Sequence, residues 1–312
     1  MKKIQSIKIE NSRKYFTLRL VAWLGLRSKL LTKIFSLLIG KKRNLPYDDV
    51  EAVYAHIDVE REAENIAFIR GIFREPHLSY MFDIGSNYMQ FASSLSDTFK
   101  EIHCYDPNTT VLEKGLVEFG RANIFTHNSA IIPCNQKVKN CYFIDVKGNS
   151  GLSSVSFEKP KESTEHQVIK QIDSEHISEI FQQKSKLDLL KIDVEGLENE
   201  LVRDAIEVSN FEGIICFESL SKKSRKEFQN IFLNLNYSFY IVKYNFSDYT
   251  GIMKNSFRGI LKAIITNKST MEVYKSTDVA DFNFEFIPLV FCVPKSLEEL
   301  VESRLDFIKG NL

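Results

Sequence analysis

Acidic side chains follow several apolar runs of this sequence, at positions where buried strands would end. The first acid is Asp83, and the turn after it contains Gly85, Ser86 and Asn87. A glycine lets the backbone approach a ligand closely, and a carboxylate accepts hydrogen bonds from ligand donors. This turn therefore favours a nucleotide-type ligand, although an ordinary strand-to-helix turn can have the same residues.

A second acid, Asp106, stands before Pro107 at the end of the next apolar run, 21 residues after Gly85. In dinucleotide and adenosyl folds, an acid about 20 residues after the glycine turn binds the ribose hydroxyls. Asp106 by itself would also suit a turn before proline. Its spacing from Asp83 and Gly85 favours the ligand-binding interpretation.

A third group of charges ends two later apolar runs. Lys191, Asp193 and Glu195 end one run, and Glu218 closes the next. Ligands of open α/β sheets bind beyond the carboxyl ends of the strands, so we expect these side chains to share a crevice with the first two acids. Acids gathered at one edge bind a cation, bind a ligand rich in hydroxyl groups, or repel each other unless one is protonated. Glu195 and Glu198 would also complement the N-terminus of the following helix.

The elements that position these residues alternate between strand and helix after Pro76, which predicts a mostly parallel sheet with helices on both faces. The expected strands cover residues 80–84, 102–105, 187–192, 214–217, 238–242 and 289–293. The expected helices cover residues 49–73, 91–99, 111–119, 197–206 and 223–235. Thr110 and Glu113 have the spacing of a capping box, which predicts a helix start there. The polar, Ser-rich segment 148–186 is expected to be irregular, and segment 244–285 matches no motif.

The chain from about residue 80 to residue 293 resembles the FkbM-type methyltransferases. The resemblance is carried by six features: Asp83-Ile84-Gly85-Ser86-Asn87, Asp106-Pro107-Asn108, Asn128-Ser129-Ala130, Gly151-Leu152-Ser153-Ser154, the run from Leu190 to Glu198, and Glu218. The run from Leu190 to Glu198, which fits Lys-x-Asp-x-Glu-Gly-x-Glu, is the most specific. Two positions depart from the family pattern: Asp106 replaces a glutamate, and Met89 replaces a glycine.

The resemblance implies a class I methyltransferase with a Rossmann-like sheet and S-adenosylmethionine as cofactor. It implies methyl transfer to an oxygen, for which we expect a hydroxyl of a saccharide or related natural product as acceptor. The residues expected to bind the cofactor are Asp83, Gly85, Ser86, Asn87, Asp106, Pro107, Asn128 and Ser129. Removal of the acceptor's proton needs a base, for which Asp193 or Glu195 is the candidate, with Glu218 or Lys191 positioning the acceptor. A side chain at Met89, where helix and strand approach closely, is expected to weaken the cofactor site.

Charge divides the chain unequally. Residues 1–45 contain twelve basic side chains and one acidic one, a charge of +11, and because the whole chain is neutral the remainder carries −11. Apolar and basic residues alternate at helical spacing over 14–39. We expect residues 1–45 to form a basic amphipathic helical arm and residues 46–312 to form the methyltransferase domain. The arm would either contact the inner face of a membrane peripherally or pack on the domain with a solvated basic face.

Composition excludes several other classes of protein. The 41 basic and 41 acidic residues balance, so no nucleic-acid partner is expected. The five cysteines form no C-x-x-C pair and the six histidines have no ligand spacing with them, so no metal site is expected from these residues. The longest apolar run near the N-terminus, residues 20–26, is far shorter than the roughly 20 residues of a membrane span, so a cytoplasmic location is expected.

Two other functions stay open. A nicotinamide-dependent oxidoreductase or epimerase would also use a glycine turn and a ribose acid. However, none of the 12 tyrosines has a lysine four residues later, as short-chain dehydrogenases require. A non-catalytic methyltransferase-like module, with its cofactor site lost through Met89, would instead dock on a membrane-associated assembly. The intact run from Lys191 to Glu198 favours a working crevice.

Overall fold

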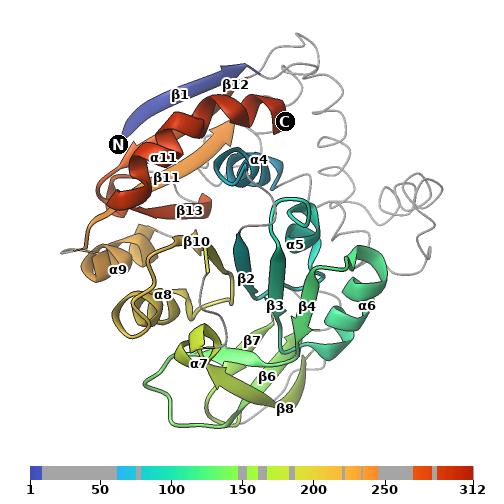
Figure 1. Cartoon of the computed structure of the whole chain (residues 1–312). Helices are drawn as coiled ribbons and strands as arrows, with labels where there is room; N and C mark the ends of the chain where they lie inside the picture. The colour runs from blue at the N-terminus through green and yellow to red at the C-terminus, as the bar shows by residue number, and fades with distance from the viewer. Residues whose placement is uncertain are drawn as a thin grey trace, which may run out of the picture.

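The structure is a computed structural model of the chain, and it describes residues 1–8, 62–74, 79–146, 153–160, 167–182, 187–219, 222–232, 235–244, 270–282 and 287–311 (Figure 1). The amphipathic segment 14–39 lies outside these residues, as does most of segment 244–285.

The main sheet has nine strands in the order β1-β12-β11-β13-β10-β9-β2-β3-β4. Its strands are β1 (Lys2–Lys8), β2 (Tyr80–Ile84), β3 (Glu101–Tyr105), β4 (Ile124–His127), β9 (Leu189–Ile192), β10 (Ile214–Ser219), β11 (Tyr237–Tyr244), β12 (Thr270–Ser276) and β13 (Ile287–Pro294). The neighbours from β10 to β4 pair in parallel, whereas β13 is antiparallel to both β10 and β11. The sheet is therefore mixed, with a parallel half that contains the predicted ligand-binding turns.

The chain reverses direction across the sheet at β2. From β2 it proceeds outward through β3 to β4, and it later returns to the other side of β2 as β9 and then β10. This reversal is the topological switch point at which open α/β sheets bind ligands. Asp83 on β2 lies opposite Lys191 on β9 in the strand register, so two of the predicted site residues are direct neighbours.

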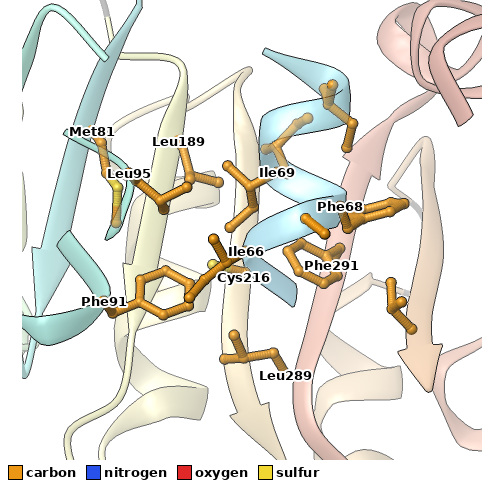
Figure 2. Packing of buried hydrophobic residues seen from close by; sticks show 14 of the residues in the cluster. Ile66, Phe68, Ile69, Met81, Phe91, Leu95, Leu189, Cys216, Leu289 and Phe291 are labelled. Atoms are coloured by element: carbon orange, nitrogen blue, oxygen red, sulfur yellow. The ribbon is translucent and has the colours of Figure 1, made fainter. Parts of the chain in front are cut away.

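Helices cover both faces of the sheet, as predicted. They are α4 (Ala63–Ile72), α5 (Gln90–Ser94), α6 (Thr109–Phe119), α7 (Ile177–Gln182), α8 (Glu198–Glu207), α9 (Lys222–Phe232) and α11 (Lys295–Arg304), with 3₁₀ turns at Val279–Asp281 and Leu305–Asn311. On one face α4 packs Ile66 and Phe68 against strand residues such as Leu189 and Phe291 (Figure 2). On the other face α7, α8 and α9 pack against alternate residues of the same strands, for example Leu190. Burial on both faces explains why these strands are almost continuously apolar.

A second sheet of four strands, in the order β5-β8-β6-β7, is inserted between β4 and β9 (Figure 1). It consists of β5 (Ala130–Ile132), β6 (Asn140–Val146), β7 (Ser154–Ser156) and β8 (Gln167–His176). The expectation that segment 148–186 is irregular is therefore wrong, because β7, β8 and α7 lie within it. β8 escaped prediction because most of its residues are half-buried or exposed, so it lacks the apolar alternation of a buried strand.

The N-terminus also differs from the expectation of a helical arm over residues 1–45. Lys2–Lys8 forms the edge strand β1, antiparallel to β12, and Gln5 Nε2 donates to Asp306 Oδ1 at 2.8 Å. The first eight residues are thus part of the main sheet. β1 carries lysines at its exposed positions, which is typical of an edge strand protected from pairing with other chains.

The helix after β3 begins earlier than its capping-box spacing indicates. The N-cap is Asn108, whose side chain accepts a hydrogen bond from the amide of Val111. The prediction of a start at Thr110 is therefore wrong by two residues, since the free backbone donor is the Val111 amide and Asn108 accepts from it. This shift makes Asn108 a structural link between α6 and Asp106, as described below.

Candidate active site at the carboxyl edge of the sheet

The turn after β2 is held between its two neighbouring strands. Gly85 has a positive φ of +77°, and a Cβ built on it would lie 1.7 Å from the carbonyl oxygen of Asp193. The amides of Gly85 and Ser86 donate to the carbonyl of Tyr105 at 2.9 and 3.2 Å, and the Asp193 amide donates to the Ile84 carbonyl at 2.9 Å. Glycine is therefore required at position 85, because the turn after β2 touches the turn after β9 there.

Asp106 lies at the end of β3 with both carboxylate oxygens engaged. Its Oδ2 accepts from the amide of Asn87 at 2.9 Å, and its Oδ1 accepts from the amide of Asn108 at 2.8 Å. Burial raises the pKa of Asp106 to about 6, against the opposing effect of the two amides. The carboxylate thus has a fixed orientation beside the turn after β2. Pro107 follows directly.

The turn after β4 is joined to this region by a chain of hydrogen bonds. Asn128 Nδ2 donates to the carbonyl of Asp106 at 3.1 Å, and Thr109 Oγ1 donates to Asn128 Oδ1 at 2.7 Å. Ser129 is buried beside Asn128. The structure therefore brings together the three turns that contain the predicted cofactor-binding residues.

Lys191 is a buried counter-ion for two carboxylates. Its Nζ lies 3.0 Å from Asp83 Oδ1 and 3.3 Å from Asp193 Oδ2, and it donates to the Gly85 carbonyl at 3.5 Å. Burial alone would lower the pKa of Lys191, but the two carboxylates outweigh burial and raise it above its usual value. Burial raises the pKa of Asp83, and the nearby Lys191 opposes that shift. Because Lys191 stays charged, it can balance the charge of the two carboxylates and position a ligand, but it cannot accept a proton.

Asp193, Glu195 and Glu218 form a cluster of carboxylates beyond β9 and β10. One oxygen from each lies within 4.8 Å of the others. Burial raises the pKa of Glu218 to about 9, and the proximity of Asp193 and Glu195 adds to that shift. Burial likewise raises the pKa of Glu195 to about 7, with contributions from Asp193 and Glu198. At neutral pH Glu218 therefore holds a proton, and Glu195 is close to half-protonated.

The turn that contains Glu195 is stabilised by Glu198, the first residue of α8. Glu198 Oε1 accepts from the amides of Val194 and Gly196, both at 3.2 Å, and its Oε2 accepts from Gly196 at 3.0 Å. Glu195 itself has a positive φ of 54°, a strained conformation for a residue with a side chain. Of the two acids expected to complement the helix N-terminus, Glu198 lies in the first turn of α8, whereas Glu195 lies before the helix and belongs to the acidic cluster.

Met89 does not obstruct the ligand-binding edge. Its φ of 58° is left-handed, which is the conformation that the glycine expected at this position would adopt without strain. The side chain is fully buried in the core with Phe91, Leu95 and Leu112, and a Cβ on Gly115 would lie 3.0 Å from the end of it. The methionine therefore adds backbone strain on the order of 1 kcal/mol, and its side chain packs in the core.

Two polar atoms of the candidate cofactor site are buried without a partner. Asp83 Oδ2 and Ser129 Oγ are among the buried side-chain atoms of the described residues that have no hydrogen-bond partner. Such atoms are costly in a folded protein unless a ligand or water satisfies them. They lie on the turns that the sequence assigns to a nucleoside-type cofactor, so the residues present fit that kind of group.

Sequence reasoning did not assign a role to Asn108 beyond its place in the Asp-Pro-Asn motif. The structure shows that its amide holds Asp106 and its side chain caps α6. An asparagine directly before a helix is a common N-cap, and this signal competes in the sequence with the capping-box spacing of Thr110 two residues later.

The family of this chain follows from a match to a family model. The model described as "Methyltransferase FkbM domain" matches residues 56–249. The chain belongs to this family. The FkbM domain match includes the glycine turn, Asp106, Lys191 and the acidic cluster, and the sheet order agrees with a Rossmann-like methyltransferase fold.

Solved structures similar to this FkbM-family chain include three methyltransferases. The precorrin-6y C5,15-methyltransferase from Geobacter metallireducens is 9% identical, with 73% of this chain and 84% of that one covered and a TM-score of 0.37. An rRNA methylase from Streptococcus thermophilus is 8% identical, with 74% and 93% covered and a TM-score of 0.38. The plantazolicin methyltransferase BamL, solved with SAH and a desmethyl substrate analogue, is 12% identical, with 91% and 98% covered and a TM-score of 0.36. No curated protein matched the chain.

None of the helices that the structure describes has the length and apolar composition needed to cross a membrane.

Proposed function

We propose that this chain is an S-adenosylmethionine-dependent O-methyltransferase that methylates a hydroxyl group of a saccharide or related natural product. The observation that carries the proposal is the contact between Gly85 and Asp193, which places the cofactor-type turn directly against the acidic cluster. A methyl donor on one side of this contact and a base on the other would meet at the switch point of the sheet.

The residues that would hold the cofactor come from three turns. They are Asp83, Gly85, Ser86, Asn87, Asp106, Pro107, Asn128 and Ser129. The Asp106 carboxylate, fixed by two backbone amides, has lone pairs left to accept hydrogen bonds from ribose hydroxyls. When bound, S-adenosylmethionine supplies an electrophilic methyl group on a sulfonium.

Asp193 is the base in this proposal. Its carboxylate is partly exposed, and Lys191 at 3.3 Å stabilises its ionised form. Asp193 would accept the hydroxyl proton of the acceptor as that oxygen becomes nucleophilic. Glu195, with a pKa of about 7, is the second candidate for this role.

Glu218 and Lys191 have positioning roles. With a pKa of about 9, Glu218 keeps its proton at neutral pH and can donate a hydrogen bond to an acceptor oxygen or to Asp193. Lys191 stays charged, because burial is outweighed by Asp83 and Asp193. An acceptor rich in hydroxyl groups would suit this cluster, since each carboxylate accepts hydrogen bonds from hydroxyls.

The first experiment is isothermal titration of the full chain with S-adenosylmethionine and S-adenosylhomocysteine. We expect micromolar binding of both compounds. Asp106→Ala should weaken it by about 100-fold, because charged acceptors of hydrogen bonds contribute about 1.5 to 3 kcal/mol each. Asp173→Ala is the matched control, since Asp173 is an exposed aspartate on β8 that pairs with Asn140. Absence of binding to both compounds would overturn the proposal and favour the non-catalytic docking module.

Turnover then tests the base. Once an acceptor is found by screening hydroxylated saccharides, Asp193→Asn is expected to reduce kcat by a factor of about 10² to 10⁴ without changing the affinity for S-adenosylhomocysteine. Glu195→Gln should have a smaller effect. Full turnover in both variants would show that neither residue is the base.

A further inference from the structure

The second sheet contacts the Asp-Pro-Asn turn through the side chain of Asp145. Asn108 Nδ2 donates a hydrogen bond to Asp145 Oδ1 at 3.4 Å. Asp145 lies near the end of β6, whereas Asn108 lies between β3 and α6 in the main domain. The contact therefore joins the inserted sheet to the loop that holds Asp106.

Asp145 is itself held in place within the inserted sheet. Ser153 Oγ donates to the same Oδ1 at 3.4 Å and accepts from the amide of Val146 at 3.1 Å. Lys170 on β8 lies 3.7 Å from the other carboxylate oxygen. Residues of β6 and β8, together with Ser153 directly before β7, thus hold the Asp145 carboxylate, which accepts the hydrogen bond from Asn108. Ser153 belongs to the Gly-Leu-Ser-Ser motif, to which no role has been assigned so far.

Asn108 transmits this contact to Asp106. It is buried; its backbone amide donates to Asp106 Oδ1 at 2.8 Å, and its side-chain oxygen caps α6 by accepting from Val111. The Asn108 carboxamide has its oxygen toward the Val111 amide and its NH₂ group toward Asp145, so one orientation makes both hydrogen bonds. Without that acceptor, the carboxamide loses the interaction that selects its orientation, and the loop before α6 becomes freer to move.

We infer that Asp145 is a positioning residue for cofactor binding, which orients Asp106 through Asn108 and couples the inserted sheet to the cofactor edge. This inference rests on the proposed cofactor site. Asp145 is not placed against the cofactor: it acts through the asparagine. The inserted sheet then has a role in the site in addition to any contact with the acceptor.

The test compares Asp145→Ala and Asp145→Asn with the wild-type protein. Asparagine at position 145 keeps an oxygen that can accept from Asn108, whereas alanine removes it. Asp173→Ala is the control, because Asp173 is an exposed aspartate of the same sheet whose carboxylate accepts from Asn140 within that sheet at 2.9 Å. Two quantities are measured on each full chain: amide hydrogen exchange of Asn108 and Val111 without ligand, and the Kd for S-adenosylhomocysteine.

We expect Asp145→Ala to accelerate exchange of the Asn108 and Val111 amides about 5-fold and to raise the Kd about 5- to 10-fold, as loss of one hydrogen bond predicts. Asp145→Asn should stay close to wild type in both quantities, and Asp173→Ala should match wild type. Rescue by asparagine separates positioning from a general loss of stability. Thermal unfolding of each variant verifies that the chains are folded.

Unchanged exchange in Asp145→Ala would overturn the coupling, as would an equal change in Asp173→Ala. Unchanged Kd together with faster exchange would overturn the positioning of Asp106. If the wild-type protein bound no S-adenosylhomocysteine, the proposed function would fail, and with it the role in cofactor binding. The exchange measurement would then still decide whether Asp145 orders the Asn108 loop, so the two failures are distinguishable.

Discussion

The two acidic regions at the carboxyl edge of the sheet differ in what surrounds their carboxylates. Near β2 and β3, Asp83 faces the Lys191 ammonium and Asp106 faces two backbone amides. Near β9 and β10, Asp193, Glu195 and Glu218 face one another. The carboxylates of the first region face fixed donors, with one oxygen of Asp83 left without a partner, whereas the second region is crowded with like charge.

Because of this difference, the carboxyl edge of the sheet can both bind a ligand and transfer a proton. Fixed donors hold a carboxylate in one orientation, which suits binding of a ligand with defined hydroxyl positions. Crowding and burial raise the pKa of Glu195 to about 7 and that of Glu218 to about 9, so a proton can be held or released at this cluster near neutral pH, which suits proton transfer. Lys191 contacts both regions, since it lies between Asp83 and Asp193.

The largest effect is expected where the two regions touch. Gly85→Ala would place a methyl group against the Asp193 carbonyl and force a positive φ on alanine, so the turns after β2 and β9 must separate. We expect a loss of unfolding free energy of about 3 kcal/mol or more and loss of cofactor binding, measured by denaturant unfolding and titration. Gly196→Ala is the control: φ is positive there too, but nothing lies within 4 Å of the added Cβ. It should cost only about 1 to 2 kcal/mol, and equal losses in both variants would contradict the close contact.

The crowded region should become more stable when one of its acids is neutralised. Because Glu218 has a pKa of about 9 when folded, the native state binds more protons than the unfolded state between pH 4.5 and 9, and stability falls as pH rises through that window. Glu218→Gln should therefore increase the free energy of unfolding by several kcal/mol at pH 8, at about 1.4 kcal/mol per pH unit above 4.5, and by little at pH 4. Turnover should fall in the same variant.

The matched control is Glu299→Gln on the exposed face of α11, which should change neither stability nor turnover. A stability gain in Glu218→Gln that does not shrink toward low pH would show that charge crowding is not its cause.

The first region should show its own pH dependence. Asp106 has a pKa of about 6, so lowering the pH below 6 protonates the carboxylate and removes an acceptor for ribose hydroxyls. We expect affinity for S-adenosylhomocysteine to fall about 10-fold between pH 7 and pH 5. In Asp106→Asn the affinity should be lower throughout and nearly independent of pH over that range. A pH profile that persists in this variant would assign the titration to another group.

The smallest effect on cofactor affinity is expected for the basic segment 14–39, which lies outside both regions and outside the described residues. Its charge predicts partitioning onto anionic liposomes, worth about 1 kcal/mol per basic residue near the surface. Replacing Arg19, Arg27, Lys29 and Lys33 with glutamine should reduce partitioning at least 10-fold and leave cofactor affinity unchanged. Unchanged partitioning would contradict peripheral membrane contact through this segment.

Sequence patterns predicted β2, β3, β9 and β10 of the parallel half because these strands are buried on both faces, but they did not predict β4 (Ile124–His127), which is only partly buried. The run 80–84 is β2 as predicted, and the acids after β2, β3, β9 and β10 do meet at one edge. Sequence patterns predicted β1 and β8 poorly. Both strands are half-exposed, and their stability comes from pairing with β12 and β6, which are distant in the sequence.

The sequence alone determined the buried strands and the helices between them, the identity of the acids at the sheet edge, and the motifs of the family, because burial and turn chemistry are encoded locally. Only the tertiary structure decided which carboxylates face fixed donors and which are crowded. The Asp106 carboxylate accepts hydrogen bonds from the backbone amides of Asn87 and Asn108, which lie in two different loops. The pairing of β9 with β10 places Asp193 beside Glu218. It also decided that the Met89 side chain packs in the core and that Asp145 reaches Asn108. Protonation and orientation depend on neighbours that come from distant parts of the chain, and folding alone brings them together.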